Sequence, residues 1–68
     1  MKMDKPFKGV ISGWQLNTNR VDGICVFHTD YSNGIARGYP ITTSEVKRIF
    51  MMNGALTLET KNSYYVLV

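Results

Sequence analysis

The segment TTSEVKRIFMMNG, Thr42 to Gly54, decides the fold class, because the apolar spacing changes there from that of a strand to that of a helix. Val46, Ile49 and Phe50 recur at intervals of three and four residues, which is typical of one face of an amphipathic helix. We therefore expect these three side chains to face the core of the domain.

The ends of the same segment carry helix signals. Thr42 followed three residues later by Glu45 fits a capping box at a helix N-terminus. The pair Asn53-Gly54 fits a C-terminal stop. The sequence thus predicts one short helix over residues 43–52, which must be held by packing because a helix of this length is not stable alone.

Apolar runs separated by turn residues precede this helix, as in a β-rich domain. The second run is apolar on both faces, which predicts a central strand covered on two sides. The third run has Pro40 near its end, and because Pro40 lacks an N–H, the end of this strand should lie at the edge of a sheet. The predicted strands are residues 7–16, 24–29 and 35–41, with turns at 17–23 and 30–34.

A hairpin follows the helix, in the stretch ALTLETKNSYYVLV. Leu56 and Leu58 alternate with polar residues, whereas YYVLV is apolar on both faces. Its last strand needs a second neighbour besides its hairpin partner. That neighbour is either the first strand, which would close a barrel, or a strand of another subunit.

The expected order is therefore strand, strand, strand, helix, strand, strand, within a single domain of residues 1–68 that is mainly β with one short helix (α+β). In layout alone, this order resembles an OB-type fold, a partly open small barrel. A curved antiparallel sheet with the helix on one face is the alternative.

The chain is small and has few internal cross-links to stabilise it. It has 68 residues and a single cysteine, Cys25, so no disulfide forms within the chain. Domains of this size are marginally stable without a disulfide, a metal or oligomerisation. The free thiol and a first ten residues without an apolar run predict a cytoplasmic protein.

Positive charge is in modest excess, with eight Lys and Arg against five Asp and Glu. Lys2, Lys5 and Lys8 lie in the first eight residues, and we predict a flexible basic arm over residues 1–6. Such clustered cations either stay solvated or attract phosphates through counterion release.

Few residues suggest catalysis. His28 and Asp30 share a face of an extended strand, and such a pair can orient a general base. Cys25 is expected on the opposite face from His28. One His, one Cys and five scattered carboxylates give no metal-ligand cluster. We expect no catalytic residues, no metal, no cofactor and no enzymatic activity.

Turn-placed cations and exposed aromatic rings form the candidate ligand site, because aromatic side chains stack on bases while cations hold phosphates. The alternative is that most of the aromatic rings belong to the core or to a subunit interface. The stretch RGYP, Arg37 to Pro40, can likewise serve either ligand approach or packing. The candidate residues are Arg20, Arg37, Lys61, Tyr31 and Tyr39.

Two functions from different classes follow. The first is a non-enzymatic binding module for a phosphate-bearing ligand, either nucleic acid or a nucleotide. The second is a protein–protein or inhibitor module, such as an accessory protein of a phage or mobile element that acts on a host component.

The chain is also expected to form a homo-oligomer, with a dimer favoured. The second and last strands are apolar on both faces, while one helix covers only one face of a sheet. The hairpin Leu56–Val68 is the expected contribution to the interface, and a closed monomeric barrel is the competing arrangement.

Overall fold

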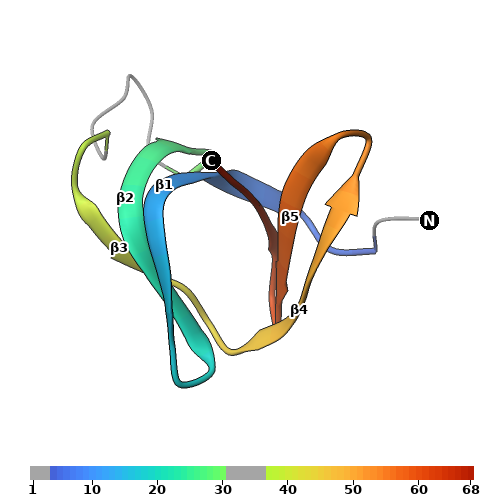
Figure 1. Cartoon of the computed structure of the whole chain (residues 1–68). Coiled ribbons are helices and arrows are strands. Elements are labelled where there is room, and N and C mark those ends of the chain that lie inside the picture. The colour runs from blue at the N-terminus through green and yellow to red at the C-terminus, as the bar shows by residue number, and fades with distance from the viewer. Residues whose placement is uncertain (1–3, 31–36) are drawn as a thin grey trace.

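A computed structural model describes residues 4–30 and 37–68 of the chain, and these residues form one curled β-sheet (Figure 1). The sheet is mixed and has six strands. They are β1 (Phe7–Asn17), β2 (Arg20–His28), β3 (Pro40–Thr42), β4 (Val46–Met52), β5 (Ala55–Thr60) and β6 (Tyr64–Leu67).

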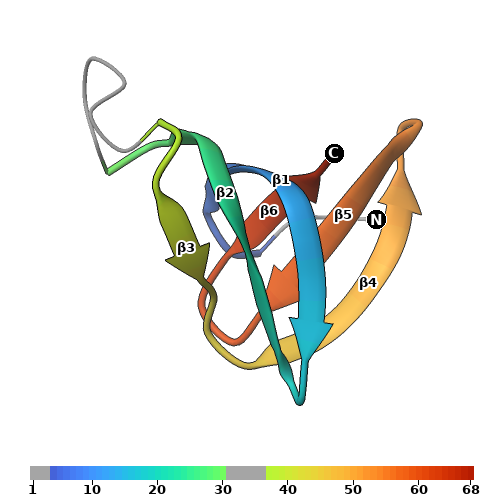
Figure 2. The ribbon, with the colours of Figure 1, turned by 60° about the vertical axis from the view of Figure 1, so that its left-hand side comes forward.

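The strands lie side by side in the order β3-β2-β1-β6-β5-β4. Neighbours are antiparallel except β1 and β6, which run parallel. Two meanders, β1–β2–β3 and β4–β5–β6, are thus joined through the first and last strands. Figures 1 and 2 show the sheet rolled so that its two end strands, β3 and β4, lie on opposite sides of the molecule and are joined by the short connection at its lower end.

The predicted helix over residues 43–52 is wrong, and with it the α+β class. The described residues contain no helix, and Val46–Met52 forms strand β4, paired antiparallel with β5. Asn53 and Gly54 both have positive φ, 51° and 80°. This is the conformation of a two-residue hairpin turn that favours Asn-Gly, so the pair turns a strand here and does not end a helix.

A β-bulge explains why the strand carries a helical spacing. The pairing of β4 with β5 shifts between Val46 and Arg48, so Lys47 is an extra residue on β4. Val46 and Ile49 therefore both pack against the core although they are three residues apart. Phe50 was expected to pack beside them. It is paired with Thr57 of β5, however, and its side chain lies on the other face of the sheet.

The core is built on the inner face of the curl. Its buried residues come mainly from β1, β2, β5 and β6, and partly buried side chains of β1, β3, β4 and β5 pack around them. Gly23 belongs to this region because a side chain there would collide with Ile11. The buried cluster is Ile11, Val21, Leu58, Tyr65 and Leu67, and the surrounding residues are Trp14, Ile41, Val46, Ile49 and Leu56.

The connection between β3 and β4 closes one end of the roll. Thr43 is buried and exchanges hydrogen bonds with Val21: its N–H donates to the Val21 carbonyl at 2.9 Å, and its hydroxyl accepts the Val21 N–H at 3.1 Å. The Val46 N–H then donates to the carbonyl of Asn19 at 2.7 Å, and Glu45 accepts from the Lys61 N–H at 2.8 Å. Residues 43–46 thus bridge the β1–β2 turn and the β5–β6 turn.

The second strand differs from its expected form in two ways. It begins at Arg20 because the turn before it has only two residues, with Asn17 paired to Arg20. It is also covered on one side only: Cys25 is buried, whereas Ile24 and Phe27 are 41% and 50% exposed. The expectation of a strand covered twice is therefore wrong.

The third strand is shorter within the described residues than the predicted 35–41. It spans Pro40–Thr42 and pairs with β2 alone, so Pro40 does lie on an end strand of the sheet. Residues 31–36, including Ile35 and most of the predicted turn, fall outside the described residues.

The C-terminal hairpin forms as predicted, and β6 takes the first strand as its second neighbour. Tyr64, Tyr65 and Leu67 are all less than a tenth exposed, so the inner face of β6 and the Tyr64 end of its outer face are covered within the chain.

The segment before β1 is tied to the sheet. Lys5 Nζ lies 2.5 Å from Glu59 Oε2, and the Tyr64 hydroxyl donates to Asp4 Oδ1 at 3.2 Å. Residues 4–6 of the predicted basic arm therefore lie against β5 and β6.

Across the described residues, none belongs to a helix of the length and apolarity needed to cross a membrane.

Candidate functional site

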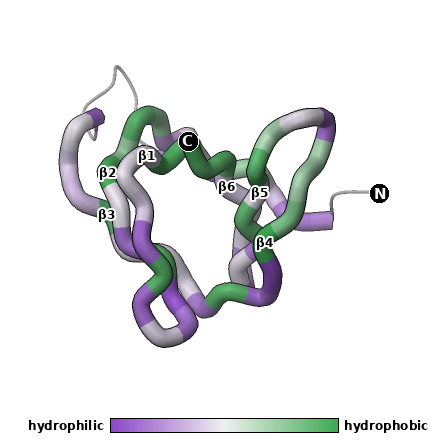
Figure 3. Tube along the Cα trace, in the orientation of Figure 1, coloured by the Kyte–Doolittle hydropathy of each residue, from purple (hydrophilic) through white to green (hydrophobic). Residues whose placement is uncertain are grey.

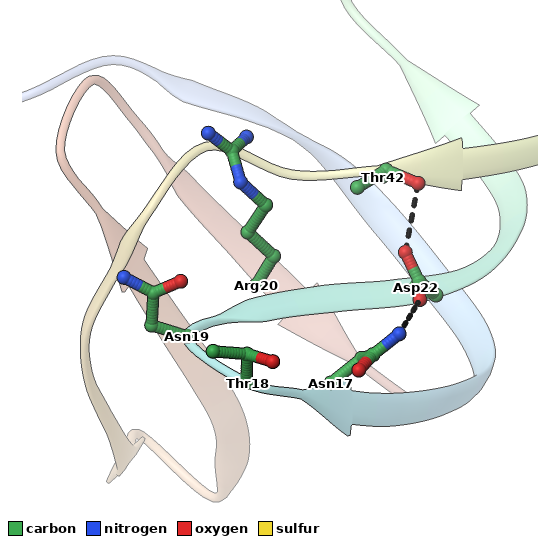
Figure 4. A pocket seen from close by; sticks show the side chains of 6 residues that line it. All are labelled: Asn17, Thr18, Asn19, Arg20, Asp22 and Thr42. Atoms are coloured by element: carbon green, nitrogen blue, oxygen red, sulfur yellow. Dashed lines mark hydrogen bonds between the residues drawn. The ribbon is translucent and has the colours of Figure 1, made fainter.

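The described surface has an open polar pocket at the β1–β2 turn (Figure 4). Its volume is about 320 Å³. Hydrophilic residues dominate this end of the molecule, as Figure 3 shows at the β1–β2 turn. The lining residues are Asn17, Thr18, Asn19, Arg20, Asp22 and Thr42.

Asp22 forms the acidic side of this pocket and is fully engaged by its neighbours. Its Oδ1 accepts a hydrogen bond from the Thr42 hydroxyl at 2.7 Å, and its Oδ2 accepts from Asn17 Nδ2 at 3.3 Å. Figure 4 shows these two bonds linking β1, β2 and β3. The carboxylate thereby fixes the wall of the pocket, because both of its oxygens bind groups from neighbouring strands.

Arg20 forms the basic side. It is the residue paired with Asn17 at the start of β2, and it was predicted as a ligand residue. Its Nη1 donates to the carbonyl of Thr43 at 3.1 Å, so the guanidinium reaches toward the bridge between β3 and β4 (Figure 4). A guanidinium has five N–H donors in a planar fork, and one bond to a carbonyl leaves most of them available to a ligand.

Lys61, a second predicted residue, contacts the same bridge from the other side. Its N–H donates to Glu45, and the neighbouring Asn62 amide donates to the Ser44 hydroxyl at 3.1 Å. Arg20 binds the bridge at Thr43. The two cations therefore belong to one end of the molecule, on either side of residues 43–46.

The ion pairs among residues 4–30 and 37–68 involve other cations. Lys8 pairs with Asp30, and Lys47 with Glu45, at 3.0 and 3.1 Å. Lys5 and Arg48 share one carboxylate, as described below. Among the described residues, the lysines and arginines without an ion pair are Arg20, Arg37 and Lys61, the three cations that the sequence predicted as ligand residues.

Arg37 and Tyr39 lie at the opposite end of the roll. The N–H of Cys25 donates to the Tyr39 carbonyl, and Gly38 donates back to Cys25, which fixes this stretch beside the later half of β2. Both side chains are exposed, and Tyr39 is 64% exposed. The remaining candidate, Tyr31, lies outside the described residues. The predicted set thus divides between two ends of the molecule.

Glu59 is the centre of a separate charge cluster on β5. Arg48 Nε lies 2.6 Å from Glu59 Oε1, and Lys5 Nζ lies 2.5 Å from Oε2. Hydrogen bonds from Lys5 and then from Arg48 hold the pKa of this carboxyl below its ordinary value. The Arg48 guanidinium also lies 4.3 Å from the centre of the Phe50 ring. This cluster fastens the N-terminal segment and β4 to β5.

His28 and Asp30, the pair weighed for catalysis, form a turn contact. The Asp30 N–H donates to His28 Nδ1 at 3.1 Å, and the Asp30 carboxylate pairs with Lys8. In the described part of the chain, no three His, Cys, Asp or Glu side chains lie together as metal ligands would.

Sequence reasoning missed the pocket residues that surround Arg20. Asn17, Thr18 and Asn19 were assigned to a long turn, and the short two-residue turn was not recognised. The polar run NTNR was the available signal, because consecutive Asn, Thr and Arg residues supply hydrogen-bond donors at one loop.

Comparison of the chain with protein-family models, curated proteins and solved structures finds no match.

Proposed function

We propose that the chain is a non-enzymatic binding module for a phosphate-bearing ligand, nucleic acid or nucleotide, held at the end of the roll that carries the β1–β2 turn. The observation that carries this proposal is the distribution of ion pairs. Four of the seven described lysines and arginines are paired with carboxylates, and the pocket residue Arg20 and its neighbour Lys61 are not.

The chemistry of the pocket supports the same class of ligand. Phosphate oxygens accept hydrogen bonds from guanidinium, ammonium, amide and hydroxyl groups, and this end offers all four kinds. Within the pocket, Arg20 supplies a charge and Asn19 and Thr18 supply neutral donors, while Lys61 supplies a second charge from the other side of residues 43–46. Both oxygens of Asp22 accept hydrogen bonds from Asn17 and Thr42. The hydrogen bond that Arg20 donates goes to a backbone carbonyl and does not involve this carboxylate, so the guanidinium stays available to a ligand.

Arg37 and Tyr39 form a second contact in this proposal. Their end of the roll carries an exposed ring and an unpaired cation, which suits a stacked base beside a phosphate. A single nucleotide would use one end only, whereas a strand of nucleic acid could reach both.

The test is the salt dependence of binding to a labelled single-stranded oligonucleotide, with inorganic phosphate and a free nucleotide as competitors. Replacing Arg20 and Lys61 by Gln should weaken binding at low salt and flatten the dependence of log K on log salt by about one unit for each lost phosphate contact. Each single replacement, Arg20→Gln or Lys61→Gln, is compared with Lys8→Gln, which removes one charge from the other end of the roll.

Competition shows whether the phosphate-bearing ligand is a nucleotide or a nucleic acid. A free nucleotide that competes as well as the oligonucleotide assigns a nucleotide site, while affinity that grows with strand length assigns nucleic acid. Binding that remains equally tight after Arg20, Arg37 and Lys61 have all been replaced would overturn the proposal.

The second candidate is a protein–protein or inhibitor module, including one carried by a phage or mobile element. It is supported by exposed apolar side chains on β1, β2 and the chain end. The salt dependence of binding distinguishes the two candidate functions, because a contact made by apolar surfaces tolerates salt that weakens phosphate binding. A cytoplasmic location is part of both proposals, and the buried reduced thiol of Cys25 is compatible with it.

A further inference from the structure

The outer face of β2, β1 and β6, turned away from the core, is apolar across all three strands. The register places Val10 of β1 between Phe27 of β2 and Val66 of β6. Residues opposite one another in a sheet present their side chains on the same face. These three therefore form a continuous row on the side opposite the buried Ile11.

The neighbouring positions extend this row. Ile24 is opposite Ser12, two residues beyond Val10, and therefore on the same face. Val68 follows Val66 by two residues, and its N–H donates to the Ile11 carbonyl at 2.9 Å. Phe7 stacks on Phe27 with ring centres 6.4 Å apart and planes 17° apart. We call this set the outer patch: Phe7, Val10, Ile24, Phe27, Val66 and Val68.

The outer patch is exposed. Phe7 and Ile24 show 38% and 41% of their surface, Phe27 shows 50% and Val68 shows 65%. Together with the half-buried valines, the exposed apolar area is on the order of 400 Å², the size of patch that on small proteins marks an interaction site.

No charged side chain belongs to the outer patch, and the polar Ser12 lies beside it, opposite Ile24. The nearest cation along β1, Lys8, is drawn to Asp30 beyond the end of β2. The rest of the chain carries a formal charge of +3. Two copies would repel through most of their surfaces, and this neutral face is where they can approach.

We propose that the outer patch is a homodimer interface, in which two copies pack their β2-β1-β6 faces against each other about a two-fold axis. A neutral apolar face is complementary to itself, as an isologous contact requires. A partner recognised through charge would find no counter-charge here. The stacked rings of Phe7 and Phe27 form the aromatic centre that such interfaces favour.

The area buried between the two copies indicates how tightly this dimer binds. Two patches bury about 800 Å² of apolar surface, and with a polar rim the total reaches about 1,200 Å², the low end for specific interfaces. We therefore expect a dimer that dissociates on dilution. Its contacts leave the β1–β2 turn free, so the inference is independent of the proposed phosphate site.

This interface differs from the one expected from the sequence. The hairpin Leu56–Val68 was expected to contribute as a whole, but Leu58, Tyr64 and Leu67 are buried within the chain. Only Val66 and Val68 of the hairpin belong to the outer patch, and β1 and β2 supply the rest.

The test is sedimentation of the full chain over a concentration range from about 1 μM to about 500 μM, which brackets a weak interface of this size. The wild-type chain should pass from monomer to dimer in this range. Phe27→Lys places a charge in the centre of the outer patch and should raise the dimer dissociation constant at least about tenfold. Met51→Lys, an equally apolar and exposed side chain on β4, should leave it unchanged.

Val68→Lys is the second variant, because its place after the last strand makes it harmless to folding. Thermal unfolding of each variant confirms that the monomers compared are folded. A wild-type chain that stays monomeric at the highest concentration overturns the interface. A dimer that survives both Phe27→Lys and Val68→Lys but is broken by Met51→Lys also overturns it.

Discussion

Val46 and Ile49 both pack against the core of the sheet although they are three positions apart in one β-strand. In a regular strand, residues three apart face opposite sides. The bulge at Lys47 removes one step of the alternation and returns both side chains to the same face. Which side chains of β4 face the core therefore depends on this one extra residue.

The first prediction concerns this strand. Ile49→Ala should lower the free energy of unfolding by about 2–4 kcal/mol, because it removes a large side chain packed on the core. Met51→Ala on the same strand should change it by less than about 0.5 kcal/mol, since Met51 is 63% exposed. Chemical denaturation followed by tryptophan fluorescence measures both. Equal losses for the two variants would show that β4 presents another face to the core.

The second prediction concerns the β4–β5 turn. Gly54 has φ of 80°, where a side chain is strained, so Gly54→Ala should destabilise the chain by about 1 kcal/mol or more. Asn53→Gly is the matched control, because glycine adopts the positive φ of position 53 without strain. Unfolding midpoints give both values. If a helix ended at this point, Asn53→Gly would shift the unfolding midpoint as well.

The strands at the two ends of the chain could be read from the sequence, and the middle could not. The first strand and the C-terminal hairpin follow from apolar runs bounded by turn residues. The Asn53-Gly54 pair, however, has two meanings: it ends helices and it turns hairpins. The sequence offers no local feature that separates these meanings, because the choice depends on pairing of β4 with β5.

The faces of the strands were predictable only where the pleat is regular. Regular alternation along the first strand would place Trp14 on the same face as Val10, but Trp14 packs on the core with Ile11. Irregular pairing between Ser12 and Gln15 and the positive φ of Gly13 cause the change. Such bulges are set by contacts with the neighbouring strand, so alternation counted along one strand cannot reveal them.

The sequence predicted which charged residues belong to the candidate site, but it did not predict how they are arranged in space. Turn positions identified Arg20, Arg37 and Lys61, and none of these three forms an ion pair with another residue of the described ranges 4–30 and 37–68. Whether they lie together depends on how the sheet rolls. The bridge of residues 43–46 brings Arg20 and Lys61 to one end, and β3 carries Arg37 to the other.

The third prediction concerns acid stability. The pKa of Glu59 lies below its ordinary value because Lys5 and Arg48 bind its carboxylate. A carboxyl whose pKa is lower in the folded chain stabilises the fold above the unfolded pKa of about 4.3, and this contribution disappears as pH falls through the folded pKa. Stability of the wild-type chain should therefore fall on acidification below about pH 4.3.

Glu59→Gln provides the control for this prediction. It should lower stability at pH 7 and flatten the acid dependence, because the titrating group is gone. Unfolding midpoints measured from pH 7 to acid give the comparison. An acid profile of the variant that parallels that of the wild-type chain would assign the acid sensitivity to other carboxyls.

The central claim is that phosphate groups bind at the end of the roll formed by the β1–β2 turn and residues 43–46. The most direct measurement is an NMR titration of the isotope-labelled chain with a free nucleotide, in which the backbone amide shifts report where the ligand lies. The account predicts that the largest changes fall on residues 17–22, 42–46 and 61–62, and that Arg20→Gln with Lys61→Gln abolishes them. Shifts confined to Arg37 and Tyr39, or no shifts in any part of the chain, would contradict it.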